Sequence, residues 1–207
     1  MLEYKTVEQQ SSDEFIERRS KFIGYVRPVT TEDDAISFIN EIRAKHWDAT
    51  HNVYAYSLRD GNIRRYSDDG EPQGTAGIPV LDVIQKTGVQ DVVVVVTRYF
   101  GGIMLGAGGL VRAYSHGAKI ALESGNIIAM ALCYNASVKC DYNQYGRLSA
   151  IIHKHGGKVV NTEFFDNVSI SFYVPADNFE GLKKDFADAT CGSVEIIETG
   201  EEFVKIN

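Results

Sequence analysis

Hydrophobic residues in the first half of the chain follow the patterns of β-strands. Residues 20–29 form a mostly apolar stretch, and residues 51–58 place apolar and aromatic side chains on alternating sides. Five consecutive valines, residues 92–96, form an unbroken apolar run. A strand that is apolar on both sides is covered on both sides, so this run predicts a buried central strand.

Helical segments and a glycine-rich loop separate these strands. Apolar residues at helical spacing, preceded by threonines that can act as caps and by three acidic residues, predict a helix over about residues 31–46. Residues 64–79 hold three glycines and two prolines, which predicts a structured loop. A short helix is expected from residue 79, and a longer one over residues 110–124, ended by Gly125.

The pattern changes from residue 127 onward. The expected elements are a strand, a helix, two strands, a helix and a last strand, over about residues 130–140, 142–156, 158–165, 168–174, 175–189 and 193–204. That order, βαββαβ, is the ferredoxin-like plan. The sequence therefore predicts an α+β protein with a first domain over residues 1–131 and a second, ferredoxin-like domain over residues 132–207.

Composition narrows the class of protein. The chain has 207 residues, 44% hydrophobic and 24% charged, which is typical of globular proteins. The N-terminal segment is polar, without the apolar core of a signal peptide, and the longest apolar run is too short to cross a bilayer. Three cysteines without a CxxC pair favour reduced thiols. We therefore expect a cytoplasmic protein with no membrane contact.

The net charge limits how the chain can meet nucleic acid. The formal charge is −7 at pH 7, which opposes attraction to RNA, DNA or an anionic membrane by the field of the whole chain. Any contact with nucleic acid must therefore use a local basic patch.

A glycine-rich segment follows the valine strand and leads into a helix. Its glycines let the backbone approach a ligand, and the free N–H groups at the start of a helix attract anions. The same glycines also permit tight packing of strand and helix, and both interpretations stay open. The dinucleotide fingerprint lacks its third glycine, and no P-loop is present. The candidate binding positions are Gly101, Gly102, Gly106, Gly108 and Gly109.

Aromatic and basic side chains flank these glycines. Tyr99 and Phe100 beside Arg98 and Arg112 can stack single-stranded bases and neutralise phosphates. Alternatively, the two aromatic residues belong to the core and the two arginines pair with acids of the preceding loop.

That loop is acidic. Asp68, Asp69 and Glu71 lie within four residues, and such carboxylates can hold a cation or act as an acid–base pair. The spacing of a calcium loop is absent, and carboxylates beside glycine and proline more often form turns and caps. His51 opens a strand whose end faces this loop. No catalytic residue, metal site or cofactor is predicted.

Three segments carry a resemblance to a known family. HWDATH (residues 46–51), DDGEPQGTAGIP (68–79) and TRYFGGIMLGAGGLVRAY (97–114) closely resemble the YigZ/IMPACT family, over about residues 15–125. The part after about residue 135 is similar to the second domain of bacterial YigZ members. The resemblance implies a first domain like domain 2 of ribosomal protein S5 and a second like a ferredoxin-like domain of elongation factor G. Eukaryotic IMPACT proteins are linked to translational control under amino-acid stress.

Two functional hypotheses follow from the residues and the resemblance. The first is a non-enzymatic binding protein linked to translation, whose first domain contacts RNA, the ribosome or translation factors. The alternative is an enzyme or binder of a small phosphorylated metabolite, held at the glycine-rich loop 101–109. A plain protein-interaction module is a third hypothesis, and the sequence does not indicate an oligomeric state. We expect the key side chains to converge on one face of the first domain: His51, Asp69, Glu71, Arg98, Tyr99 and Arg112.

Overall fold

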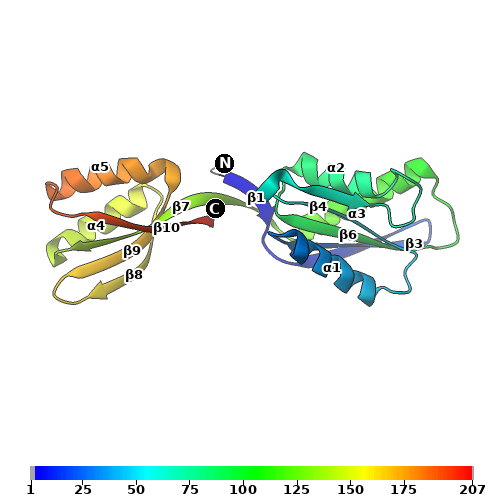
Figure 1. The fold of residues 1–207 in the computed structure, drawn as a ribbon, viewed down its shortest axis with the longest axis horizontal. Helices are drawn as coiled ribbons and strands as arrows, with labels where there is room; N and C mark the ends of the chain where they lie inside the picture. Colours follow the sequence, from blue (N-terminus) through cyan, green and yellow to red (C-terminus); the bar gives the residue numbers. More distant parts are fainter. Residues whose placement is uncertain (1–2, 207) are drawn as a thin grey trace. The chain divides into compact units, whose positions relative to one another are not determined.

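The computed structural model describes residues 3–206, and its helices and strands divide between two compact units (Figure 1). One unit is Tyr4–Ala129, and the other comprises Glu3 and the residues from Met130 onward. Both units mix helices with a β-sheet, so the two-domain α+β fold predicted from the sequence is confirmed. The separability of residues 1–131 and 132–207 stays a prediction, since one strand, β7 (Ile127–Cys140), runs through that boundary.

The first unit contains a five-stranded sheet in the order β2-β3-β6-β4-β5, and every neighbouring pair is antiparallel. Its strands are β2 (Ser11–Glu17), β3 (Ser20–Pro28), β4 (His51–Ser57), β5 (Arg64–Ser67) and β6 (Val92–Tyr99). A 3-10 turn, η1 (Asp60–Asn62), precedes β5. Its helices are α1 (Glu32–Lys45), α2 (Gly77–Thr87) and α3 (Ala107–Ser124).

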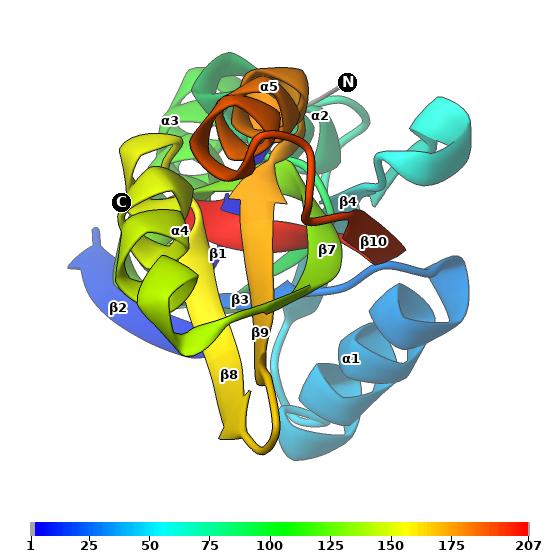
Figure 2. The same cartoon turned by 90° about the vertical axis from the view of Figure 1, so that its left-hand side faces the viewer.

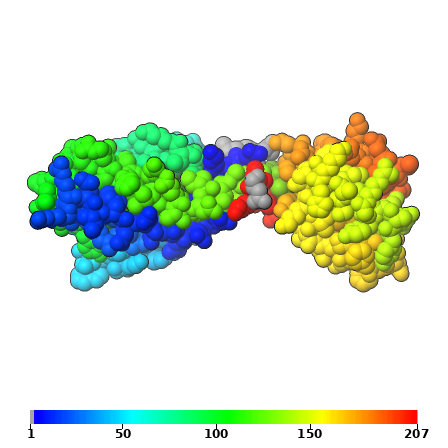
Figure 3. All heavy atoms as spheres, turned by 180° about the vertical axis from the view of Figure 1, so that it is seen from behind, coloured from blue at the N-terminus to red at the C-terminus, as the bar shows by residue number. Residues whose placement is uncertain are grey.

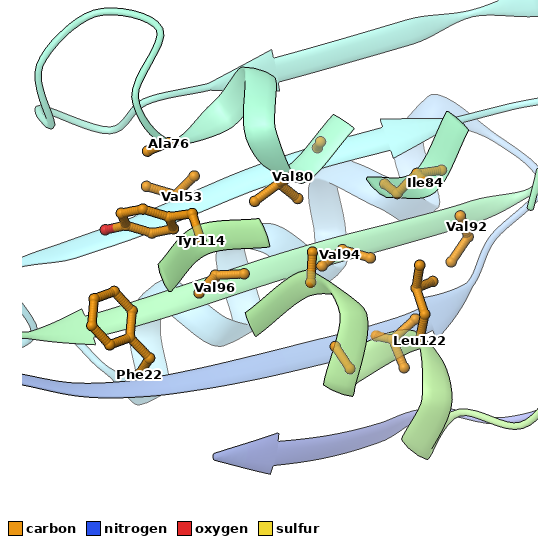
Figure 4. Close-up of a cluster of buried hydrophobic side chains, with 14 of the residues drawn as sticks. Phe22, Val53, Ala76, Val80, Ile84, Val92, Val94, Val96, Tyr114 and Leu122 are labelled. Atoms are coloured by element: carbon orange, nitrogen blue, oxygen red, sulfur yellow. The ribbon is translucent and has the colours of Figure 1, made fainter. Parts of the chain in front are cut away.

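The valine strand lies at the centre of this sheet, and helices cover both of its sides (Figure 1). Val92, Val94 and Val96 belong to the core beneath α2 and α3 (Figure 4). Val93 and Val95 belong to the core beneath α1. All five are fully buried, so the prediction of a strand covered on both faces is confirmed.

Two local predictions for this unit were wrong, and one strand, β2, was not predicted. Residues 64–67 form β5, because they pair with β4, although their sequence predicts a loop. The polar segment β2 pairs with β3 along its whole length, from Ser11 opposite Val26 to Glu17 opposite Ser20. Helix α3 begins at Ala107, so Gly108 and Gly109 form its first turn instead of a preceding loop. Strand pairing and helix packing outweigh local propensity at each place.

The second unit has the predicted βαββαβ order: β7, α4 (Tyr142–Lys154), β8 (Lys158–Phe164), β9 (Val168–Pro175), α5 (Phe179–Thr190) and β10 (Ile196–Ile206). A 3-10 turn, η2 (Ala176–Asn178), precedes α5. The sheet runs β1-β7-β9-β8, where β1 is Glu3–Val7, and β10 also pairs with β7. The first strand of this unit therefore lies between the third and the fourth, as in ferredoxin-like domains. Figure 2 shows β8 and β9 as a hairpin beside α4.

Aromatic side chains gather on the surface of this unit where α4 begins. The ring of Phe164 packs against Tyr142 and Tyr145, and the Tyr142 hydroxyl donates to the carbonyl of Phe165. Tyr142, Phe164 and Phe165 are all exposed, and the yellow atoms of this region form part of the surface in Figure 3. Within residues 3–206, no helix is both long and apolar enough to cross a bilayer.

Asp185 on α5 carries a prediction for the acid stability of the second unit. Its carboxylate accepts hydrogen bonds from Lys154 at 2.7 Å and from His155 at 2.8 Å, which lower its pKa from 3.8 to about 2. A carboxyl group with a lowered pKa stabilises the fold above the ordinary value, and this contribution disappears as the pH falls through the lowered value. Asp185→Asn is expected to melt below the parent at pH 5 and to approach it near pH 2.

Thermal unfolding followed by circular dichroism between pH 2 and pH 5 measures this convergence. Asp188→Asn, at an exposed position of the same helix, is the matched control and should show no such trend. A constant difference between Asp185→Asn and the parent over this range would contradict the assignment.

Candidate functional site

The candidate site lies at the end of the first sheet where β4 begins and β6 ends. His51 stands directly opposite Arg98 in the antiparallel register of β4 and β6. The amide of Thr50 donates to the Arg98 carbonyl at 2.9 Å, and the Phe100 amide donates to Thr50 Oγ1 at 3.0 Å. These bonds tie the segment before β4 to the segment after β6, so side chains distant in sequence meet here.

A buried carboxylate is the centre of the site. Glu71 Oε1 accepts a bond from Arg98 at 2.6 Å and from the Tyr114 hydroxyl at 2.7 Å. The side chains of Glu71 and Arg98 are 3% and 6% exposed. Figure 4 shows the Tyr114 hydroxyl pointing away from the valine row. A buried charge must be paired and hydrogen-bonded, and Glu71 meets both conditions through these two partners.

A hydrogen bond to the acidic loop orients the ring of His51. Its Nδ1 lies 2.8 Å from the carbonyl oxygen of Asp69, which can only accept, so Nδ1 carries a proton. In the neutral ring Nε2 is then an acceptor, and it lies 3.8 Å from Glu71 Oε1. The expectation that His51 faces the acidic loop is confirmed.

Burial shapes the electrostatics of the site. Desolvation raises the pKa of Tyr114, and its hydrogen bond to the Glu71 carboxylate raises it further, so the hydroxyl keeps its proton. The guanidinium of Arg98 lies between two aromatic rings, with Cζ 5.5 Å from the centroids of Phe22 and of Phe100. Arg98 Nε is buried and has no hydrogen-bond partner within the described residues.

A pocket of about 540 Å³ opens over these groups. Ligand pockets of proteins have volumes of roughly 300–1,000 Å³ and combine an apolar lining with a few polar groups. This one has that composition, since apolar side chains of the segment 100–110 adjoin His51, Glu71 and Arg98. It is lined by Thr50, His51, Gly70, Glu71, Pro72, Arg98, Phe100, Met104, Leu105, Gly106, Ala107 and Leu110.

The other two acids of the loop have structural partners. The Asp68 carboxylate accepts from the amides of Gly74, Ala76 and Gly77, so it holds the start of α2. This confirms the interpretation of that carboxylate as a turn and cap. The Asp69 carboxylate accepts from Arg43 and from the backbone amide of Asn52, away from the pocket. Among the described residues no cluster of three or more His, Cys, Asp or Glu side chains is arranged for a metal ion.

The glycines of the loop differ in what they do. A Cβ atom at Gly101 would lie 2.0 Å from the Arg19 carbonyl oxygen, so close packing against the β2–β3 turn requires glycine there. Gly102 and Gly106 have φ angles of 82° and 71°, which favour glycine, and open space around the Cβ position. Of the five candidate glycines, only Gly106 lines the pocket. The packing interpretation therefore holds at Gly101, and the ligand interpretation stays a prediction at Gly106.

Tyr99 does not join the pocket, although it is adjacent to Arg98 in sequence. Its hydroxyl donates to Asp48 and lies 2.8 Å from Nδ1 of His46, while His46 Nε2 lies 2.6 Å from the Tyr25 hydroxyl. Burial lowers the pKa of His46, which favours a neutral ring in this chain of hydrogen bonds. The ring of Tyr99 packs on the core beneath α1, on the other side of the sheet.

Arg112 also lies elsewhere. It lines a second pocket of about 440 Å³, together with Phe15, Arg18 and His116. The structure thus brings His51, Glu71 and Arg98 together, with Asp69 bonded to His51 through its carbonyl, and places the side chains of Tyr99 and Arg112 elsewhere. Alternate residues of a strand point to opposite sides of the sheet, which separates Tyr99 from Arg98.

Sequence reasoning missed several side chains of the site. Tyr114, the second partner of Glu71, follows Leu110 by one helical turn, and that spacing places both on the buried face of α3. Met104, which lines the pocket, was also missed, as was Trp47 in the segment before β4; both are more than four-fifths exposed. Trp47 is the single tryptophan of the chain, which is the signal that singles it out.

The fold and the site define a class of protein. It is a two-domain α+β protein whose first domain carries, at one end of its sheet, a partly apolar pocket beside a buried Glu–Arg pair. The Impact N-terminal domain matches residues 18–122, and a domain of unknown function, DUF1949, matches residues 138–193. The chain belongs to the IMPACT family.

Relatives match along most of this chain. "IMPACT family member YvyE" of Bacillus subtilis is 35% identical over 94% of this chain and 90% of its own length. "IMPACT family member YigZ" of Escherichia coli is 32% identical over 89% of this chain and 92% of its own length. A solved structure titled "Crystal structure of an hypothetical protein" matches with a TM-score of 0.62 and 30% identity, and covers 97% of this chain and 98% of that one. The predicted family is confirmed.

Proposed function

We propose that this chain is a non-enzymatic binding protein of the translation apparatus, whose first domain holds a translation factor at the end of the sheet described above. The observation that carries the proposal is the exposure of large apolar side chains there: Trp47 is 83%, Met104 81% and Phe100 48% exposed. Aromatic residues and methionine are enriched in protein interfaces, and tryptophan is frequent among the residues that dominate binding energy.

The link to translation rests on the family. The resemblance of residues 46–51, 68–79 and 97–114 to IMPACT proteins lies in the segments that build this end of the domain. Such a role places the protein in the cytoplasm, and free thiols at Cys133, Cys140 and Cys191 accord with that location.

Charge favours a protein partner over RNA. Arg98, expected to contact phosphate, is paired with Glu71, and Arg43 nearby is paired with Asp69. Tyr99, expected to stack a base, has its hydroxyl engaged by His46 and Asp48. With a net charge of −7, the chain as a whole does not attract a nucleic-acid backbone.

Site-specific photocrosslinking in the host cell tests the proposal. A photoreactive amino acid replaces Trp47 in one variant and Met104 in another, and mass spectrometry identifies what becomes attached. We expect the same translation factor at both positions. Lys86, exposed in the last turn of α2, lies at the opposite end of the sheet and is the control position, which should capture none of it.

Each other outcome decides against the proposal. Crosslinks to RNA in place of protein would favour the nucleic-acid hypothesis for this surface. Equal capture at Lys86, or capture only of proteins outside translation, would remove the link to a translation factor.

A further inference from the structure

We propose that the 540 Å³ pocket binds a small molecule that joins an anionic group, a carboxylate or a phosphate, to an apolar body. This inference goes beyond the binding of a protein partner and stands without it. It follows from two sources of hydrogen-bond donors in one pocket and from the apolar wall beside them.

The first source is the start of α3. Gly106 and Ala107 line the pocket, and the first hydrogen bond of the helix runs from the Leu110 amide to the Gly106 carbonyl. The amides of residues 107–109 therefore precede the first intrahelical donor and have no acceptor within the helix. An 18-residue helix adds the positive end of its dipole at this point.

The second source is Arg98, which lines the same pocket. The residue is 5% exposed, and its Nε has no hydrogen-bond partner within the described residues. A buried donor without a partner is rare in folded proteins and indicates a missing acceptor. The half-exposed ring of Phe100 lies beside the guanidinium.

The nearby carboxylate offsets the charge of Arg98 but does not bond its Nε donor. Glu71 Oε1 is bonded to Arg98 and to the Tyr114 hydroxyl, so its charge is balanced within the site. His51, with Nδ1 held by the Asp69 carbonyl, turns its other ring nitrogen toward Glu71.

The rest of the pocket selects an apolar body. Phe100, Met104, Leu105 and Leu110 contribute carbon surface beside the helix start. An inorganic anion alone leaves this apolar surface exposed to water. An anion with a hydrocarbon or aromatic portion buries it, which favours binding.

The full chain is titrated with octanoate, phenyl phosphate, inorganic phosphate and 1-octanol, and amide chemical shifts are followed by NMR. Octanoate and phenyl phosphate are expected to saturate and to shift the amides of Ala107 and Gly108. Inorganic phosphate should bind more weakly at the same amides, and uncharged 1-octanol should leave them unmoved. Preference for octanoate or for phenyl phosphate identifies the anionic group.

Two variants separate the parts of the site. Ala107→Pro removes one amide donor at the first helical position, where proline is compatible with the helix. This variant should bind octanoate roughly 10–100-fold more weakly, because it loses one hydrogen bond to a charged group. Met104→Ala should lower the affinity for octanoate several-fold and leave the affinity for inorganic phosphate unchanged. Lys119→Gln, which removes an exposed charge from the same helix, is the control and should bind as the parent does.

Three results would overturn the proposal. One is binding of 1-octanol as tight as that of octanoate, which means an apolar pocket without anion recognition. Another is unchanged octanoate binding by a folded Ala107→Pro variant. The third is no saturable shift with any of the four probes.

Discussion

Glu71→Ala is expected to lower the free energy of unfolding of the first domain by about 3–5 kcal/mol. The substitution leaves the Arg98 cation buried without its carboxylate, and removal of one partner from a buried ion pair has costs of that size. It also leaves the buried Tyr114 hydroxyl without its acceptor. Urea denaturation followed by circular dichroism measures the loss.

Two further variants show whether the unpaired charge is the cause. Glu71→Leu combined with Arg98→Met replaces the pair by apolar groups and should recover most of the lost stability. Tyr114→Phe removes only a hydrogen bond to a charged group and should cost about 1.5–3 kcal/mol. A loss below about 1 kcal/mol for Glu71→Ala would mean that water reaches the Arg98 guanidinium and that the site is not closed.

Gly101→Ala is expected to destabilise the first domain by about 3 kcal/mol, the upper part of the range for overpacked sites. The new methyl group would lie 2.0 Å from the Arg19 carbonyl oxygen and 2.5 Å from the Ser20 amide nitrogen. Both atoms belong to the backbone of the β2–β3 turn, so relief requires the strands to shift. The same urea titration gives this value.

Neighbouring glycines are the controls. At Gly102 an added Cβ meets nothing within 4 Å, but the φ angle of 82° should cost about 1–2 kcal/mol. At Gly108 an added Cβ meets only the end of the Arg112 side chain, at 3.7 Å, so alanine should be neutral or slightly stabilising in the helix. Equal losses at all three positions would contradict the assignment of close packing to Gly101.

The sequence alone indicated the fold class and most of its elements. Five consecutive valines indicated a central strand covered on both faces, and the order of elements after residue 127 indicated the βαββαβ domain. These features are predictable because the spacing of apolar residues along the chain indicates which side of a strand or helix is buried. The threonine cap of α1 and the Asp68 turn are also local features, because donor and acceptor lie three and nine residues apart.

The candidate site was predictable only in part. Its residue types were visible: glycines before a helix, arginines beside aromatic residues, and an acidic loop. The partners were visible only in part: the alternative that the arginines pair with acids of the preceding loop holds for Arg98 and Glu71, whereas the partners of Tyr99 were not predicted. Adjacent residues of β6 point to opposite faces, so Arg98 reaches Glu71 while Tyr99 reaches His46 and Asp48.

Only the tertiary structure decided these pairings, and strand register is the reason. The alignment that sets His51 opposite Arg98 joins residues 47 positions apart, and no local signal specifies such a register. The same holds for β2 and β5, whose polar sequences become strands because β3 and β4 offer them free edges. The sequence therefore indicates which side of an element is buried. The contact between Glu71, Arg98 and Tyr114 forms only when β6, α3 and the loop between β5 and α2 pack together.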